Sequence, residues 1–347
     1  MEQAVTPKRS VLSNTEFRSL WLAEAQSVLG DQLAKVAITL AVFNRTHSAL
    51  WSAVVFALTY LPALAGGLGL SGLADRYPRR TVMLSGLAGQ AVMVALMAVP
   101  HTPLALMYVL LTFSGFAQAP ALAAQNAMTR DVFTDDAEYF RSQDLRQATT
   151  NTMMLVGLAV AGLLVTAIGP SWALAIDAAT FVVSIVLVRF GVKWRPAAGG
   201  EHQSWTAGIR VAATTPWLRT LLGISYLVGL AVVPEGLAAP LAEQLGAPGK
   251  AVGWLLAADP LGYVVGLALL SKFVSQEARQ RWVGALATAS VAILLVFGLK
   301  PSLIVALFLL AAAGAVGAYQ VTVIATITSR VPNEIRGGVV GTFRTGL

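Results

Sequence analysis

Residues 285–299 and 303–316 read ALATASVAILLVFGL and LIVALFLLAAAGAV, and both runs are apolar on every face of a helix. Apolar runs of about 20 residues recur along the chain, and this is the length that an α-helix needs to cross ~30 Å of hydrocarbon. Hydrophobic residues make up 56% of the 347 residues and charged residues only 12%, whereas an ordinary soluble domain is about 25% charged. The sequence therefore predicts an all-α membrane protein with many spans. It excludes a transmembrane β-barrel, whose strands alternate polar and apolar residues.

Few residues in the sequence are suited to catalysis or metal binding. The chain has no cysteine, and its three histidines, His47, His101 and His202, lie in expected loops. Thiolate chemistry and cysteine-ligated metals are therefore excluded. The glycine-rich stretch from Gly66 to Gly69 lacks the preceding strand and the lysine of a phosphate-binding loop. We expect no enzymatic activity, no metal and no cofactor.

The apolar runs predict ten membrane spans, and an eleventh begins at Gly338 and is cut off at Leu347. Short turns at 100–102 and 169–170 separate neighbouring spans on one side of the membrane. The expected spans are residues 17–43, 50–70, 81–99, 103–128, 144–168, 171–190, 217–240, 251–272, 282–299 and 302–328.

Lysine and arginine are distributed unevenly between the two sides of the expected membrane. All but four of the 24 basic residues lie in or beside the connections of one side, Arg146 among them. The four exceptions are Arg45, Lys250, Lys300 and, inside the first span, Lys35. Because cytoplasmic loops carry the excess of basic residues, the N-terminus is expected in the cytoplasm. The net charge of +7 then reflects this orientation and requires no nucleic-acid partner.

The chain contains two similar units that are offset by about 200 residues. The second and eighth expected spans each contain a proline, Pro62 and Pro260. The fourth and tenth spans share a Gly-x-x-Gln sequence, which begins at Gly115 and at Gly317. Repeated halves of this kind are the architecture of many secondary transporters.

The repeat predicts three parts of the chain. Residues 1–190 form an N-terminal bundle of six spans, residues 191–216 form a cytoplasmic linker, and residues 217–347 form a second bundle. The second bundle is expected to be incomplete, since a full copy of the first would extend beyond Leu347.

The connection between the second and third spans carries the most specific short motif. Residues 69–80 read GLSGLADRYPRR, and this stretch resembles the Gly-x-Leu-Ala-Asp-Arg-x-x-Arg-Arg signature of the major facilitator superfamily. The positions that match are Gly72, Asp75, Arg76, Arg79 and Arg80. In that family the loop stabilises one of two alternating conformations. The resemblance implies that Asp75 pairs with Arg130 or with the first turn of the eleventh span.

The resemblance extends over nearly the whole chain. Residues 17–21, 29–31 and 331–337 look like a bacterial efflux branch of the superfamily that includes macrolide and siderophore exporters. This implies two six-helix bundles, location in the bacterial cytoplasmic membrane and transport by alternating access. Two positions differ from the branch, because Leu158 replaces a proline and Gln118 stands in a span where many proton-coupled members carry an arginine. Export therefore follows from the resemblance more directly than proton coupling does.

Ionisable residues inside the spans are candidates for function, since a charge at mid-bilayer costs at least about 2.5 to 3.5 kcal/mol. Glu24, Asp31 and Lys35 recur at spacings that place them on one face of the first span. That face is predicted to line a cavity, where protonation of Asp31 changes its attraction to Lys35 or to a cationic substrate. Alternatively, Asp31 and Lys35 only neutralise one another. Glu235, which follows Pro234, is a second candidate, and Gln118 could bind substrate through hydrogen bonds.

The sequence as a whole favours export of a small amphipathic molecule of the drug, macrolide or siderophore type. We expect a monomer in the lipid bilayer, with protons as the coupling ion. An alternative is a truncated or non-transporting membrane protein with a scaffold or regulatory role.

Overall fold

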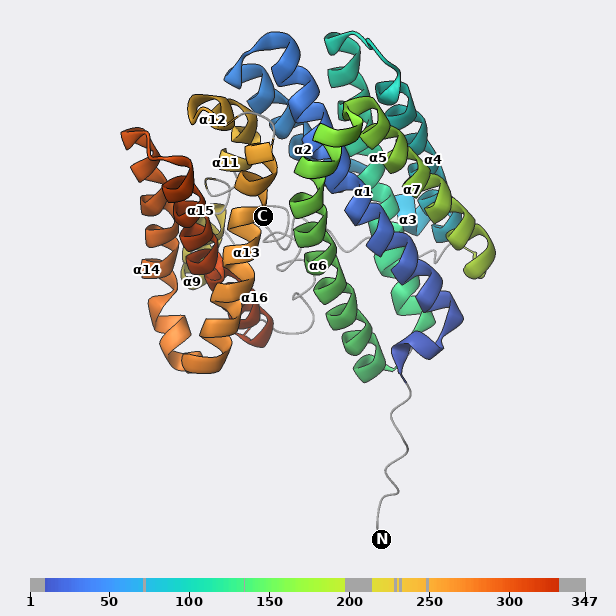
Figure 1. The fold of residues 1–347 in the computed structure, drawn as a ribbon. Coiled ribbons are helices and arrows are strands. Elements are labelled where there is room, and N and C mark those ends of the chain that lie inside the picture. Colours follow the sequence, from blue (N-terminus) through green and yellow to red (C-terminus); the bar gives the residue numbers. More distant parts are fainter. Residues whose placement is uncertain are drawn as a thin grey trace. The chain divides into compact units, whose positions relative to one another are not determined.

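The computed structural model describes residues 10–70, 73–133, 135–196, 214–227, 230, 233–247 and 250–330. Within these ranges every regular element is a helix (Figure 1). The predicted all-α architecture is confirmed. The eleventh expected span, Gly72 and most of the expected linker lie outside the described residues.

The helices follow the apolar runs closely. The N-terminal part contains η1 (Val11–Ser13), α1 (Thr15–Thr46), α2 (Ala49–Leu70), α3 (Leu73–Arg76), α4 (Arg79–Ala98), α5 (Leu104–Val132), α6 (Asp136–Ile168) and α7 (Pro170–Gly191). The C-terminal part contains α9 (Pro216–Tyr226), α11 (Val233–Gly236), α12 (Ala238–Gln244), α13 (Lys250–Phe273), α14 (Gln276–Leu295), η2 (Val296–Leu299), α15 (Leu303–Gly317) and α16 (Tyr319–Arg330).

Six helical segments in the described part of the chain are long and apolar enough to cross a membrane. They are Arg79–Ala98, Leu104–Val132, Pro170–Gly191, Ala251–Phe273, Glu277–Leu299 and Leu303–Val323. A seventh is added if Arg141–Leu158 and Val160–Ile168, which meet at a bend of 43°, form one span. The chain is therefore a multi-pass helical membrane protein, and the count of ten to eleven spans stays a prediction.

The expected seventh span, residues 217–240, is not one continuous helix in the structure. Its described residues are divided between α9, α11 and α12. Pro234 has no N–H group, and its ring clashes with a carbonyl one turn earlier in a continuous helix. Pro240 lies in the first turn of α12, where its missing N–H group would have had no partner in any case.

Local signals set the ends of several helices. The Asn14 side chain accepts hydrogen bonds from the backbone amides of Glu16 and Phe17 at 3.0 and 3.2 Å, which caps the first turn of α1. Between α6 and α7 the chain reverses at Gly169, whose φ of 84° lies in the left-handed region. Glycine enters this region without steric cost, and so a turn of a single residue suffices there.

The chain folds into two compact units. The first comprises Met1–Ala34, Tyr60–Gly157 and Ser171–Gly200, and the second comprises Lys35–Thr59, Leu158–Pro170 and Glu201–Leu347. In the first unit α4 packs along α5, and Gly86 lies so close to α5 that an added Cβ would be only 2.8 Å from the Ala117 carbonyl oxygen. Small residues therefore set the helix spacing in this unit.

In the second unit α13 packs along α15 in the same way (Figure 1). Gly262 and Gly266 form a Gly-x-x-x-Gly pair on α13, and each faces a backbone carbonyl of α15, at Ala311 and at Ala315. An added Cβ at either glycine would overlap with that carbonyl oxygen. Backbone contact of this kind is typical of helix association in membranes, where packing replaces the hydrophobic effect.

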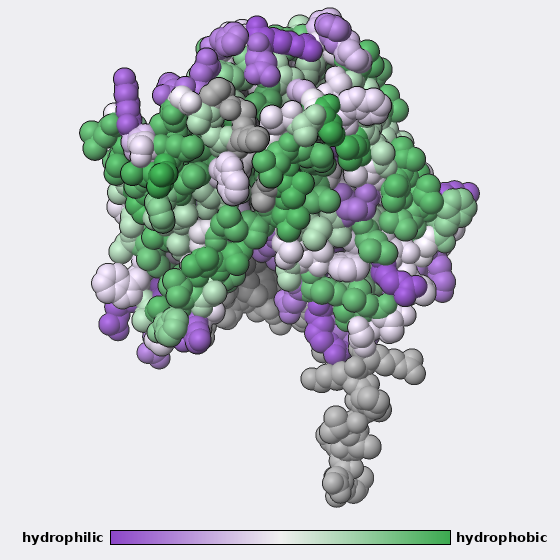
Figure 2. Space-filling view, in the orientation of Figure 1, coloured by the Kyte–Doolittle hydropathy of each residue, from purple (hydrophilic) through white to green (hydrophobic). Residues whose placement is uncertain are grey.

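Large apolar side chains are exposed along the spans. Phe308 in α15 is 73% exposed and Phe190 at the end of α7 is 82% exposed. Figure 2 shows apolar residues over much of the visible face, with hydrophilic residues gathered toward its upper and lower ends. Apolar exposure on this scale is typical of a surface that contacts lipid.

We predict that Gly262→Val lowers the stability of the purified protein in detergent. The added side chain must push α13 away from the Ala311 carbonyl, and overpacking of this kind costs about 1 to 3 kcal/mol. Thermal unfolding measures the effect as a lower Tm. Gly284→Ala in α14 is the matched control, because an added Cβ there meets nothing within 4 Å. Equal Tm values for the two variants would contradict the proposed backbone contact.

Candidate functional site

Helix α1 supplies three of the sequence-predicted site residues, Glu24, Asp31 and Lys35. Each of the three lies near a charged residue of a different helix. These are Arg146 of α6 for Glu24, Asp177 of α7 for Asp31, and Glu235 of α11 for Lys35. The shared helical face was predicted correctly from the spacing, but the partners could not be read from it.

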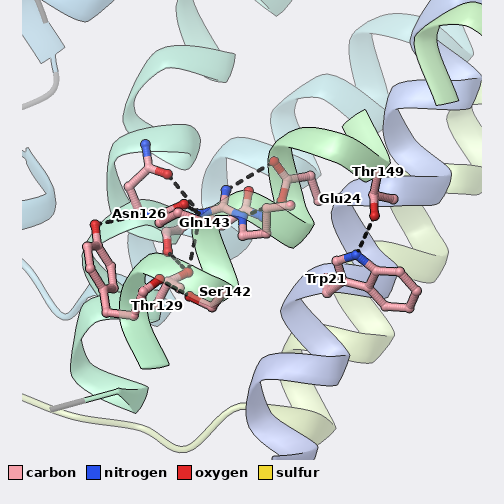
Figure 3. A network of polar contacts seen from close by, with 10 residues as sticks. Trp21, Glu24, Asn126, Thr129, Ser142, Gln143 and Thr149 are labelled. Atoms are coloured by element: carbon pink, nitrogen blue, oxygen red, sulfur yellow. Dashed lines mark hydrogen bonds and ion pairs between the residues drawn. The ribbon is translucent and has the colours of Figure 1, made fainter. Parts of the chain in front are cut away.

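Glu24 and Arg146 form a bidentate ion pair inside the first unit (Figure 3). Arg146 donates from Nε to one carboxylate oxygen at 2.6 Å and from Nη2 to the other at 3.0 Å. The Gln125 side chain of α5 donates to the same carboxylate at 3.0 Å. The Arg146 side chain is 5% exposed and that of Glu24 is 15% exposed, so the pair is largely buried, and such a pair needs good geometry to offset its desolvation.

The remaining donors of Arg146 also point at acceptors. Its Nη1 atom donates to Asn126 at 3.0 Å, to Gln143 at 3.2 Å and to Thr129 at 3.4 Å. Every nitrogen of the guanidinium group therefore has a partner. Nearby, the indole N–H of Trp21 donates to Thr149 at 2.9 Å and makes a second polar link between α1 and α6 (Figure 3). The network joins α1, α5 and α6.

From the sequence alone, Arg146 is grouped with the basic residues in or beside the connections of one side, two residues inside the expected span 144–168. Helix α6 begins at Asp136, eight residues before the expected start of the span, so Arg146 lies well inside a helix. The signal that could have revealed it is the polar pair Gln125–Asn126 within an otherwise apolar stretch of α5. Adjacent amides in a membrane helix indicate a polar partner on a neighbouring helix.

Asp31 lies near a second carboxylate, Asp177. Helix α1 approaches α7 closely at Gly30, where an added Cβ would overlap with Asp177 and Thr180. Asp177 is 1% exposed and accepts a hydrogen bond from the Thr180 hydroxyl at 3.2 Å, and Asp31 is close enough to repel it electrostatically. The structure therefore places two acidic side chains together in the first unit.

Lys35 and Glu235 approach one another in the second unit. The Lys35 ammonium nitrogen lies 3.7 Å from the Glu235 carboxylate, and the two side chains are 8% and 10% exposed. The same nitrogen lies 5.6 Å from the ring centre of Phe56 in α2. Gly236 packs against Phe56, so an aromatic surface covers one side of the ion pair.

The described contacts of the signature loop are made by its arginines. Arg79 forms an ion pair with Asp131 at the end of α5, with 2.5 Å between the charged atoms, and Arg80 donates to the Arg189 backbone carbonyl. Arg130 stacks on the Tyr139 ring at 4.9 Å. Arg76 is exposed.

Two sequence-predicted residues have a less defined role in the structure. Asp75 lies in α3, but its side chain is outside the described part of the chain, so its pairing with Arg130 stays a prediction. Gln118 is half-buried on α5. Within the described residues, no group of three or more histidine, aspartate or glutamate side chains is arranged to hold a metal ion.

A further ion pair ties the start of α1 to the segment after α7. Arg195 donates to both carboxylate oxygens of Glu16, at 2.7 and 3.0 Å, and the Lys193 amide donates at 2.9 Å. Burial raises the pKa of Glu16, but the hydrogen bonds from Arg195 and Lys193 outweigh it, and the net pKa is lowered from its ordinary value. The hydrogen bond to Glu16 likewise raises the pKa of Arg195. Glu16 thus stays ionised near neutral pH and holds this segment in place.

The long apolar helices carry charged side chains that are buried and paired with one another. This pattern is typical of a polytopic membrane protein. The chain belongs to the Major Facilitator Superfamily, because the family model with that description matches residues 20–347. The family inferred from residues 69–80 is therefore confirmed. The chain is a transporter of this superfamily, whose members are not enzymes.

Curated relatives are exporters by name. The Enterobactin exporter EntS of Escherichia coli O81 (strain ED1a) is 29% identical over 316 residues, a match that covers 86% of this chain and 73% of that protein. The protein of the same name from Shigella boydii serotype 18 (strain CDC 3083-94 / BS512) matches with the same identity and coverage.

Solved structures share the fold at low sequence identity. A bacterial homologue of the human lysosomal transporter Spinster, in an inward-facing and unoccupied conformation, aligns with a TM-score of 0.73 and 15% identity over 98% of this chain and 80% of that chain. The nucleoside transporter NupG aligns with a TM-score of 0.69 and 17% identity over 96% of this chain and 87% of that chain.

We predict that Glu24→Gln or Arg146→Gln alone strongly destabilises the protein, because each leaves the other charge buried without its counter-ion. Breaking a buried pair costs about 3 to 5 kcal/mol. The double variant should lose less than the two single losses combined, since neither charge remains. Thermal unfolding in detergent measures all three. Gln147→Ala, an exposed position on α6, serves as the control, and strictly additive losses would contradict the ion pair.

Proposed function

We propose that this chain exports a small amphipathic molecule across the bacterial cytoplasmic membrane by alternating access, with protons as the coupling ion. The observation that carries this proposal is the match to a named exporter over 86% of the chain. Enterobactin, the molecule in that relative's name, is one substrate to test beside drugs and macrolides. The expected organisation into a bundle at 1–190, a linker at 191–216 and a second bundle at 217–347 is part of the proposal.

The charges inside the spans support an ion-coupled mechanism. Asp31 lies in the middle of α1 and near Asp177, and two carboxylates at one place in the hydrocarbon repel one another. A proton on one of them removes this repulsion, so gain and loss of the proton favours different arrangements of α1 and α7. Proton binding at Asp31 could therefore be linked to the conformational state of the transporter.

The proposed orientation places the N-terminus in the cytoplasm. It is supported by the basic residues, all but four of which lie in or beside the connections of one side. Arg79, Asp131, Arg189 and Arg195 of the first unit belong to that side. Their ion pairs and hydrogen bonds would then form a cytoplasmic cluster that fixes the signature loop against the ends of α5 and α7.

Export is tested in bacterial cells that produce this chain, by measuring the accumulation of enterobactin and of a panel of fluorescent dyes and antibiotics. We expect lower accumulation of at least one compound than in cells with the empty vector. Asp31→Asn and dissipation of the proton gradient should each abolish the difference, because both prevent coupling. Glu277→Gln, an exposed carboxylate at the start of α14, is the matched control. Equal accumulation of every compound with and without the chain would contradict export.

Orientation is tested with single cysteines, which is direct because the natural chain has none. His101→Cys lies between α4 and α5, and Asp135→Cys lies between α5 and α6; both positions are exposed. A membrane-impermeant maleimide added to intact spheroplasts should label only His101→Cys. Both variants should react after permeabilisation. Labelling of Asp135→Cys alone in intact spheroplasts would reverse the proposed orientation.

A further inference from the structure

The second unit contains three charged side chains that converge from three helices. Lys35 comes from α1, Glu235 from the short helix α11, and Asp259 from α13, just before Pro260. The Lys35 and Glu235 charges are 3.7 Å apart. Helix α11 packs against α13, and Asp259 lies close enough to Glu235 for their charges to interact. One ammonium group is therefore set against two carboxylates.

This cluster differs from the Glu24–Arg146 network in how its charges are satisfied. The carboxylate of Glu24 accepts three hydrogen bonds, whereas one oxygen of Glu235 is buried and has no hydrogen-bond partner in the described part of the chain. The distance of 3.7 Å to Lys35 is an ion-pair distance but exceeds the length of a charge-assisted hydrogen bond. Burying a carboxylate oxygen without a hydrogen-bond donor costs free energy. The Glu235 oxygen is therefore suited to bind a donor, such as a proton, reversibly.

Charged and aromatic groups from three helices surround Glu235 in the described part of the chain. The titratable groups that the structure places against Glu235 are Lys35 from α1 and Asp259 from α13, while α2 contributes the apolar ring of Phe56. On α1 itself, Asp31 lies one turn before Lys35. On α13, Asp259 is held against α15, where an added Cβ at Gly314 would be 3.0 Å from its carboxylate oxygen. Asp259 thus lies at a close backbone contact between α13 and α15.

We propose that Glu235 and Asp259 together bind one proton, in competition with the ammonium group of Lys35. When the proton binds, one carboxylate becomes a neutral acid, and its new O–H group donates to the other carboxylate. Lys35 keeps its charge but then faces one negative charge instead of two, so its attraction to the pair weakens. When the proton leaves, Lys35 again faces two negative charges. Proton occupancy therefore controls the electrostatic link between α1 and α11. This deepens the proposed export function and rests on its proton coupling.

The test is infrared spectroscopy of the full chain reconstituted in phospholipid, which detects the carbonyl stretch of a protonated carboxylic acid and requires no substrate. At neutral pH the wild type should show this band. Glu235→Gln and Asp259→Asn should each remove the intensity of one carboxylic acid, and the double variant should remove no more than either single variant. Glu243→Gln, an exposed carboxylate on α12, should leave the band unchanged.

A second variant keeps the proposal testable if the carboxylate variants fail to fold. In Lys35→Gln the competing ammonium group is gone, so the band from this pair should persist to a higher pH than in the wild type. An unchanged pH dependence in Lys35→Gln, a band unaffected by both carboxylate variants, or loss of two acids in the double variant would each overturn the proposal. Absence of export with the expected spectra would refute the proposed function alone, and export with unaffected spectra would refute this site alone.

Discussion

Water is absent from the hydrocarbon core of a bilayer, and so each charge within a spanning helix requires a partner from the protein itself. This requirement organises the polar interior of the chain. Arg146 is surrounded by acceptors from α1, α5 and α6 and is thereby completely satisfied. Glu235, by contrast, has the ammonium group of Lys35 at 3.7 Å and one buried oxygen without a hydrogen-bond partner among the described residues. A charge whose hydrogen-bonding groups all have partners, such as Arg146, is suited to a structural role. A charge with an unpaired buried oxygen, such as Glu235, is suited to exchange its partner.

The packing of the apolar side chains also follows from the lipid surroundings. Lipid is as apolar as these side chains, so burying leucine or phenylalanine between helices gains little free energy. The helices associate through close packing instead. This explains why glycine and alanine lie at the α4–α5 and α13–α15 contacts while Phe308 faces outward. It also explains how Asp259 can lie against α15, because Gly314 has no side chain to keep the two helices apart.

Much of the fold could be predicted from the sequence, because each spanning helix needs a run of about 20 apolar residues. Such a run is recognisable even where single residues within it are polar. The expected starts and ends of α4 and α13 are close to those observed, and the shared face of Glu24, Asp31 and Lys35 follows from helical periodicity alone. The family followed from the residues of one loop, since its pattern of small, acidic and basic residues is specific.

The partners of the charged residues could not be predicted, because they depend on how distant helices pack. From the sequence alone, Arg146 is grouped with the basic residues near the connections, since an arginine near a span end is usually there for orientation. Its partners Glu24 and Asn126 come from α1 and α5, and the sequence does not show that these helices meet α6 at this point. Likewise, Pro234 indicated a break in the seventh span, but nothing in the sequence indicated that the break divides it into α9, α11 and α12, or that Glu235 would meet Lys35, 200 residues away.

The glycine contacts between α13 and α15 also bear on how the second unit can move. Two helices joined through backbone atoms at Gly262 and Gly266 have no side chains between them whose rotation could absorb a sliding motion. We therefore expect α13 and α15 to move together as one rigid pair. On this expectation the distance between spectroscopic labels on α13 and α15 stays constant during transport, and the pair can serve as a reference against which the motion of other helices is recorded.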